Sequence, residues 1–239
     1  MNSNQRKLTK NSFTENKSWR TALSLITIIG TLLPAAVFAG NYYLDCSAGS
    51  NGNGTMASPW NTVASVNNHA PFVAGDTIFV KRGTRCLGEL WPKGSGNSSA
   101  QIVLCAYGPG TTKPIIDAQG AANSAAIKLF NQEYWTIDGF EVTNNATSFG
   151  YRCGIRVGGN DGQVKHRFRI TNNTVRNVYA SRSFDNNPNM HNNGGIIVWI
   201  DEPGRADDVL IEGNDLHRIV GVGISFWGES EMEIGRAHV

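Results

Sequence analysis

The sequence predicts an all-β solenoid, in which short strands from successive coils stack into continuous sheets. A six-residue motif of the form Ile-x-[Gly/Asn]-x-x-[Val/Leu] occurs three times, beginning at Ile137, Ile170 and Ile211. A four-residue motif that begins with Gly-Ile follows each copy, at residues 154–157, 195–198 and 223–226. Each motif alternates apolar and polar residues, and a strand this short cannot bury its apolar face alone. Stacking equivalent strands from successive coils would build a continuous core.

The spacing of the repeats favours a β-solenoid over other repeat folds. The six-residue motifs start 33 and 41 residues apart, which exceeds one minimal coil and predicts long loops. The period-2 alternation and the Gly and Asn content exclude a helical solenoid. A β-sandwich or a propeller stays open as an alternative, although neither explains the paired motifs as well. Asn173 and Asn214 occupy the same motif position, so we expect their side chains to stack at a corner and bond to the turn backbone.

The first 39 residues have the pattern of a secretory signal peptide. Five basic residues and one acid precede the apolar stretch 21–33, and small residues end at Ala39, where we expect cleavage. An uncleaved membrane anchor is the alternative, but the apolar stretch is short for a span. The sequence therefore predicts a secreted, periplasmic or cell-surface protein, with no stable membrane insertion after cleavage. Residues 40–120 would form an N-terminal cap and the first coils, and residues 121–232 further coils.

The charge balance argues against a nucleic-acid partner. The whole chain carries 21 basic and 19 acidic residues, for a formal net charge of +2. Because five of the basic residues and one acid lie in the signal segment, the remaining chain has a net charge near −2. A nucleic-acid-binding domain would be strongly basic.

The four cysteines leave the disulfide pairing open. Cys46, Cys86, Cys105 and Cys153 allow three connectivities in an oxidising compartment. Cys86 and Cys105 flank one hairpin-like segment, whereas Cys46 and Cys86 lie in the same N-terminal module. Buried thiols without a disulfide are an equal alternative, and the spacings do not suggest a zinc site.

The last seven residues, 233–239, break the preceding pattern. The segment from Ile234 to Val239 can be encoded by a string that resembles a widely used sequencing-library adapter read in frame. A natural polar tail is the alternative. We therefore expect a foreign tail on a C-terminally truncated fragment.

The repeats resemble the right-handed parallel β-helix family of exported proteins, the fold of pectate lyases and many other polysaccharide-active proteins. Segments at 41–45, 58–63, 74–78, 106–108 and 114–117 are similar to the entry module of exported bacterial members. In that module Ser58 would cap a short helix, with Pro59 at its first position. Trp60, Val63 and Ala64 would share one side of this helix, which would cover the open N-terminal end of the solenoid.

Candidate site residues lie on the four-residue motif, which we also call the second motif, and in the loops around it. The outward positions of successive second-motif strands would stack as Lys128, Arg156, Ile197 and Ser225. The longest insertion, 178–193, holds Arg182, Asp185 and His191. The strand that follows contains Trp199 and leads into Asp201 and Glu202, with Arg205, Asp207 and Asp208 shortly after. Long loops on one face of a solenoid usually carry the binding function, so we expect these residues to converge along one groove.

The family resemblance implies β-elimination on a uronic acid. That reaction needs a group that neutralises the substrate carboxylate, often Ca²⁺, and a base that removes the C5 proton. The candidates are Arg156, Arg182 and His191 as neutraliser or base, Lys128, Trp199 and Arg205 as substrate-binding residues, and Asp185, Asp201 and Glu202 as Ca²⁺ ligands. No lyase signature surrounds these residues, so catalytic roles do not transfer from the family.

Two functions from different classes follow from the sequence. The first is an enzyme acting on a polysaccharide, with a lyase on an acidic glycan favoured over a glycoside hydrolase. A hydrolase would use carboxylates, for which Asp207 and Asp208 are candidates. The second is a non-catalytic β-helix, serving as a glycan-binding, adhesin or surface structural module, because the fold alone does not decide function.

Overall fold

A computed structural model describes residues 39–180, 193–227 and 232–233. The predicted signal segment therefore lies outside the described residues, apart from Ala39, as do Arg182, Asp185, His191 and residues 234–239. Within the described ranges, no helix is long and apolar enough to cross a membrane.

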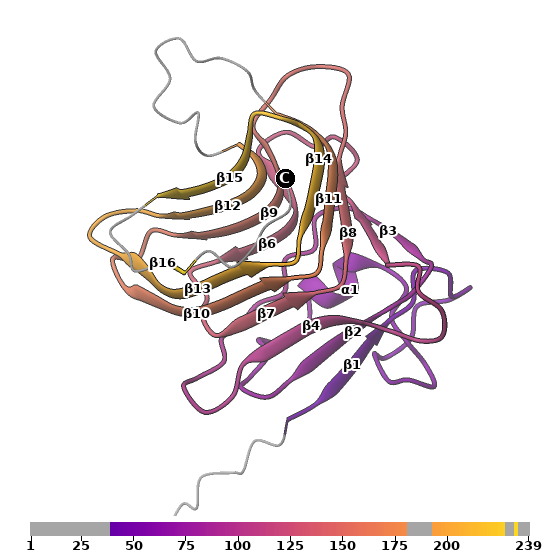
Figure 1. The fold of residues 1–239 in the computed structure, drawn as a ribbon. Coiled ribbons are helices and arrows are strands. Elements are labelled where there is room, and N and C mark those ends of the chain that lie inside the picture. The colour runs from indigo at the N-terminus through magenta and orange to yellow at the C-terminus, as the bar shows by residue number, and fades with distance from the viewer. Residues whose placement is uncertain (1–38, 181–192, 228–231, 234–239) are drawn as a thin grey trace, which may run out of the picture. The chain divides into compact units, whose positions relative to one another are not determined.

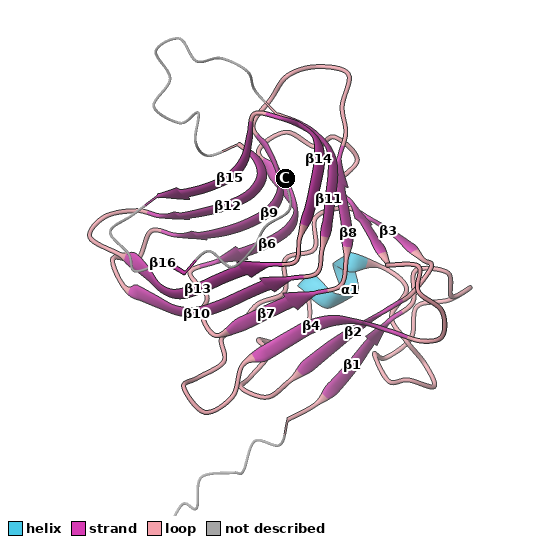
Figure 2. Cartoon of the chain, in the orientation of Figure 1, coloured by secondary structure: helices cyan, strands magenta, loops and turns pink. Residues whose placement is uncertain are grey.

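The described chain forms a right-handed parallel β-helix with three parallel sheets (Figure 1). The seven-stranded sheet consists, in spatial order, of β1 (Asn41–Leu44), β2 (Thr77–Lys81), β4 (Ile102–Tyr107), β7 (Trp135–Asp138), β10 (Val164–Thr171), β13 (Arg205–Glu212) and β16 (Met232–Glu233). The five-stranded sheet consists of β3 (Arg85–Leu87), β5 (Ile115–Asp117), β8 (Glu141–Asn144), β11 (Thr174–Tyr179) and β14 (Asp215–Val220). The four-stranded sheet consists of β6 (Ser124–Phe130), β9 (Arg152–Gly159), β12 (Gly194–Ile200) and β15 (Val222–Trp227). Figure 2 shows how little of this part of the chain is helical.

Each interval between successive repeats corresponds to one coil of the solenoid. Ile137 pairs in register with Ile170, which pairs with Ile211, so the intervals of 33 and 41 residues each close a single coil. The four-residue motifs also pair in register, since Ile155 pairs with Ile196. The segment around Ile127 pairs with Ile155 and is an earlier copy of this motif. Both stacking predictions are confirmed.

The alternation suggested that the six-residue motif is a single strand, but in the structure it is divided between two strands. Ile137 lies in β7 of the seven-stranded sheet, whereas Val142 lies in β8 of the five-stranded sheet. Gly139, between them, has a φ of 82°, a left-handed conformation that suits glycine at a tight corner. The motif therefore marks a corner of the coil, with one inward apolar residue on each side.

The predicted asparagine stack is confirmed at this corner. The Asn173 side chain donates to Ile137 O (3.1 Å) and to Asn214 Oδ1 (3.0 Å), and its own Oδ1 accepts from Phe140 N (3.0 Å). Asn214 repeats the pattern one coil on, donating to Ile170 O at 2.7 Å. Both side chains are buried. Their oxygens accept from backbone amides at the turn, and their NH₂ groups bond to carbonyls of the strands before it.

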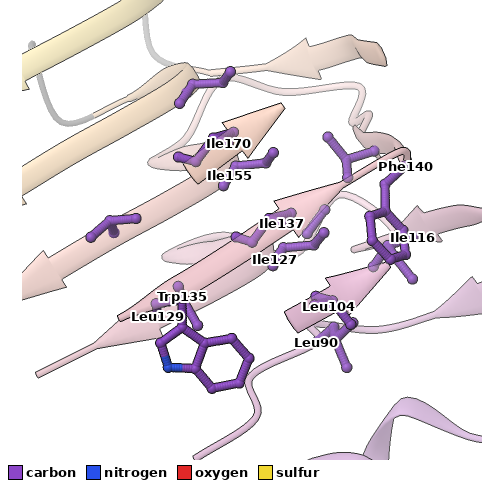
Figure 3. Close-up of a cluster of buried hydrophobic side chains, with 14 of the residues drawn as sticks. Leu90, Leu104, Ile116, Ile127, Leu129, Trp135, Ile137, Phe140, Ile155 and Ile170 are labelled. Atoms are coloured by element: carbon purple, nitrogen blue, oxygen red, sulfur yellow. The ribbon is translucent and has the colours of Figure 1, made fainter. Parts of the chain in front are cut away.

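The core consists of inward aliphatic side chains stacked from coil to coil (Figure 3). Leu104, Ile137 and Ile170 align in the seven-stranded sheet, and Ile127 and Ile155 align in the four-stranded sheet. All five are at most 1% exposed. Burying such side chains is the main favourable term in the stability of the fold.

The N-terminal helix exists, but the predicted cap residue is wrong. Helix α1 spans Val63–Asn67, and Thr62 Oγ1 accepts from Ser65 N as the N-cap. Ser58 instead forms an antiparallel bridge with Thr55, because the chain between it and the helix pairs Trp60 with Leu44. Ala64, which we expected on the buried side, is exposed.

The helix covers the first edge of the four-stranded sheet. The Asn67 side chain donates to Glu89 O (2.8 Å) and accepts from Trp91 N (2.6 Å). Between these groups, Leu90 bridges Ile127 on its other side. Asn67 therefore occupies hydrogen-bonding positions that a preceding strand would otherwise fill, which agrees with the predicted capping role.

The two candidate caps make different predictions for stability. Replacing Thr62 with Ala should lower the free energy of unfolding by about 1 kcal/mol, since the Ser65 amide loses its side-chain acceptor and keeps only the Thr62 carbonyl. Ser58→Ala is the matched control and should cost less than about 0.5 kcal/mol. Urea unfolding followed by tryptophan fluorescence measures both. A larger loss for Ser58→Ala than for Thr62→Ala would contradict this assignment.

One disulfide lies within the N-terminal module, which is one of the pairings that the sequence left open. Cys46, just after β1, is bonded to Cys86 in β3, with 5.3 Å between their Cα atoms. Cys105 and Cys153 lie outside this bond, in β4 and β9. Cys86 and Cys105 do not flank a hairpin, because β3 and β4 belong to different sheets. The disulfide fixes the cap to the second coil.

Candidate functional site

Two columns of side chains stack on the outward face of the four-stranded sheet. The first column is Lys128, Arg156, Ile197 and Ser225, as the sequence predicts. The second column, two residues further along each strand, is Phe130, Gly158, Trp199 and Trp227. Ile197 and Ser225 are buried, whereas Lys128 and Arg156 are partly exposed. The accessible cations therefore belong to β6 and β9.

The coil before β6 adds Trp91 and Lys93 to this face, and the sequence did not predict these two residues. Leu90 forms a single parallel bridge with Ile127, and this pairing places Trp91 beside Lys128. Lys128 Nζ lies 4.0 Å from the centre of the Trp91 ring, and Lys93 Nζ also lies over that ring. We call Trp91, Lys93, Lys128, Phe130 and Arg156 the basic–aromatic patch.

The charged side chains in and beside the patch have a net positive charge. Glu89 Oε1 lies 3.9 Å from Lys128 Nζ, and Glu89 Oε2 accepts from Ser124 Oγ and Ala125 N. This carboxylate is thus held in place and offsets one of three cations. Burial, and then the charge of Lys128, lower the pKa of Lys93 to about 8, against a smaller opposing effect of Glu89.

Two N–H donors of the patch are buried without an acceptor. Neither Trp91 Nε1 nor Arg156 Nε has a hydrogen-bond partner in the described part of the chain. Gly158 leaves room for the Phe130 ring, because a Cβ there would lie 2.9 Å from it, whereas Arg156 Nε would lie at an ordinary contact distance of 3.5 Å. A buried donor without an acceptor is costly, so such groups are typical of sites that await a ligand.

A second aromatic pair lies on the same face. Trp199 and Trp227 stack with ring centres 5.0 Å apart and planes inclined by 8°, and Trp227 is 47% exposed. Trp199 Nε1 donates to Asp201 Oδ1 at 2.7 Å. Flat, exposed indole rings of this kind present apolar faces beside polar edges, as sugar-binding surfaces require.

The structure brings some of the predicted site residues together and separates others. Lys128, Arg156 and Trp199 share the outward face of the four-stranded sheet. Asp201 follows β12 and is tied to Trp199, while Glu202 is exposed in the turn that follows. Arg205 begins β13 of the seven-stranded sheet, where it lines an open hollow with Glu202. The other three, Arg182, Asp185 and His191, lie outside the described residues.

The two carboxylates considered for hydrolysis belong to the seven-stranded sheet and already have side-chain partners. Asp207 Oδ2 lies 3.2 Å from His166 Nδ1, and Asp208 pairs with Arg167 (3.0 Å) and Arg169 (2.6 Å). Burial alone would raise the pKa of Asp208, but the hydrogen bonds from these two arginines lower it overall. This arrangement ties β13 to β10.

The described residues contain no group of three or more His, Cys, Asp or Glu side chains placed to hold a metal ion. Asp201 and Glu202 are adjacent, but one oxygen of Asp201 already accepts from Trp199. These two carboxylates do not make a Ca²⁺ site by themselves, since Ca²⁺ takes six to eight oxygen ligands.

Comparison with solved structures supports the fold. The chain is similar to a GH136 lacto-N-biosidase from Eubacterium ramulus, with 22% identity and a TM-score of 0.66 for a selenomethionine derivative. The native form gives 21% and 0.63, and both matches cover 75% of this chain but 34% of the other. A rhamnogalacturonan lyase gives 16% identity and a TM-score of 0.42, covering 83% of this chain and 63% of the other. No family model and no curated protein matches.

Proposed function

We propose that this chain binds an acidic polysaccharide along the outward face of the four-stranded sheet and cleaves it by β-elimination. The observation that carries the proposal is the basic–aromatic patch, in which three cations and two aromatic rings stack over three successive coils. Cations attract the anionic groups of such a chain, and aromatic rings stack on the apolar faces of its sugars. The predicted signal segment fits this proposal, since it would deliver the protein to extracellular glycans.

The patch can supply one of the two parts that β-elimination needs. Arg156 and Lys128 would neutralise the carboxylate of a uronate, which makes its C5 proton more acidic. A base would then accept that proton, and two of the predicted candidates for it, Arg182 and His191, lie outside the described residues. The C5–H electrons form the C4=C5 double bond, and the glycosidic oxygen leaves from C4 and takes a proton from water. The Trp199 and Trp227 pair would bind neighbouring sugars of the same chain.

An activity panel tests the proposal. The full chain is incubated with polygalacturonate, alginate, hyaluronan and chondroitin sulfate, and with neutral galactan, while ultraviolet absorbance and new reducing ends are followed together. We expect absorbance from an unsaturated product with at least one acidic polymer and none with galactan. Parallel reactions with Ca²⁺ or with a chelator test the predicted dependence on that ion.

The two readouts separate the alternatives. Reducing ends without absorbance would replace β-elimination by hydrolysis. Binding to an acidic polymer in affinity electrophoresis without either signal would leave a glycan-binding module. Absence of binding and of product with every acidic polymer would overturn the proposal as a whole.

A further inference from the structure

We propose that Trp91, Lys93, Lys128 and Arg156 form a preformed subsite for one carboxylate or sulfate group of a glycan, and that Lys93 takes up a proton when the anion binds. This inference rests on the proposed function for the glycan, since it concerns the same face. It adds the group that is recognised, the residues that recognise it and the dependence of binding on pH.

The unpartnered donors place an acceptor in this position. Trp91 Nε1 and Arg156 Nε are both buried and lack an acceptor among the described residues. They flank Lys128, because Trp91 lies beside Lys128 on one coil and Arg156 pairs with it on the next. Adjacent strands lie about 4.8 Å apart, so the two donors come from coils about 10 Å apart, with Lys128 on the coil between them. An oxyanion has several acceptor lone pairs and can bond to more than one of these donors at once.

The charges of the subsite favour an anion over a neutral sugar. Lys93, Lys128 and Arg156 supply three cations, and Glu89 supplies one carboxylate, which is already engaged with Ser124, Ala125 and Lys128. Lys128 is only 20% exposed in its side chain and Glu89 23%, so solvent screens these charges incompletely. One bound anion would offset about half of the remaining positive charge.

Lys93 couples the subsite to pH. Its amine lies over the Trp91 ring and faces Lys128 from β6, with Glu89 as the nearby acid. Burial and the Lys128 charge hold the pKa of Lys93 at about 8, so at pH 8 about half of the molecules carry a neutral amine. A bound anion would stabilise the protonated form and raise this pKa. Binding would therefore take up roughly half a proton at pH 8, and affinity would fall as the pH rises above 8.

Isothermal titration calorimetry of the full chain tests the subsite with three oligosaccharide probes. Oligogalacturonate carries carboxylates, a carrageenan oligosaccharide carries sulfates, and a galacto-oligosaccharide is neutral. We expect at least one anionic probe to bind ten times more tightly than the neutral probe at pH 7. The anionic probe that binds more tightly identifies the group. Titrations at pH 8 in two buffers with different ionisation enthalpies should reveal the proton uptake.

Two variants test whether Lys93 is the source of the proton uptake. Lys93→Arg keeps a permanent charge, so it should abolish the proton uptake and the loss of affinity between pH 7 and pH 9. The matched control is Lys113→Met, because Lys113 is also a lysine whose pKa is lowered, mainly by burial, but it bonds to Thr174 on another sheet. This control should leave both signals unchanged.

Failure of the subsite and failure of the proposed reaction are distinguishable. Proton uptake that persists in Lys93→Arg, or equal affinity for neutral and anionic probes, would overturn the subsite even if acidic polymers are cleaved. Preference for an anionic probe, with proton uptake that Lys93→Arg abolishes, would support the subsite even if no unsaturated product forms.

Discussion

Replacing Asn173 with Ala should lower the free energy of unfolding by about 4 kcal/mol. The side chain is fully buried and serves Phe140 N, Ile137 O and Asn214 Oδ1. Alanine would leave Phe140 N without its partner inside the coil, at a cost of about 1–3 kcal/mol, and would remove one hydrogen bond to Ile137 O. Loss of the Asn214 contact and the small cavity add to this cost. Because a solenoid can lose coils separately, hydrogen exchange at the Phe140 amide should be followed together with urea unfolding.

The neighbouring asparagine provides the control for this prediction. Asn172 is exposed, has a φ of 55° and donates to Asp138 Oδ1 at 2.8 Å. Asn172→Gly keeps the left-handed conformation available and removes one exposed hydrogen bond, so it should cost less than about 1 kcal/mol. Similar losses for the two variants would show that the buried stack does not hold the corner.

The sequence predicts the stacking of the coils because the alternation and the stacking have the same physical origin. An apolar residue at Ile137, Ile170 and Ile211 has to face the interior, and the interior of a solenoid aligns equivalent positions. The asparagine positions predicted a corner inside the six-residue motif, but alternation does not reveal that the chain changes sheet there. A glycine at position 139 and the asparagine of the next copy, Asn173, were the available signals.

The N-terminal module was predicted less well, because its details depend on tertiary pairing. Ser58 and Thr62 are both reasonable N-caps by residue type. The pairing of Trp60 with Leu44 draws the chain into an extended form and delays the helix to Val63. The disulfide between Cys46 and Cys86 likewise depends on the distance between β1 and β3, which spacing in the sequence does not determine.

Half of the patch could be predicted from the repeat and half could not. Lys128 and Arg156 lie within recognisable copies of the second motif, so their alignment followed from register. Trp91 and Lys93 belong to a coil whose third strand is reduced to one bridge at Leu90, and no Gly-Ile precedes it. Their alternation with Leu90 and with Pro92, both buried, was the only local signal.

Replacing Arg156 with Gln should weaken binding of an acidic polysaccharide by about 10–150-fold. The change removes a cation and the buried Nε donor, and a hydrogen bond to a charged group is worth about 1.5–3 kcal/mol. Arg156→Lys keeps the charge but cannot present a guanidinium, so we expect an intermediate loss of about tenfold. Affinity electrophoresis in gels that contain the polymer compares the variants with the original chain.

The control for Arg156 is a cation of similar type on a different sheet. Arg167 lies in β10, where its ion pair with Asp208 is exposed, and Arg167→Gln should leave polysaccharide binding within a factor of two. Thermal unfolding should be similar for all Arg156 variants, because Arg156 Nε makes no hydrogen bond to the described chain. If Arg156→Gln binds as the original does, or if Arg167→Gln is equally impaired, the polymer does not contact this face of the solenoid through its cations. If binding falls equally for neutral galactan, the loss comes from the aromatic surface and not from charge.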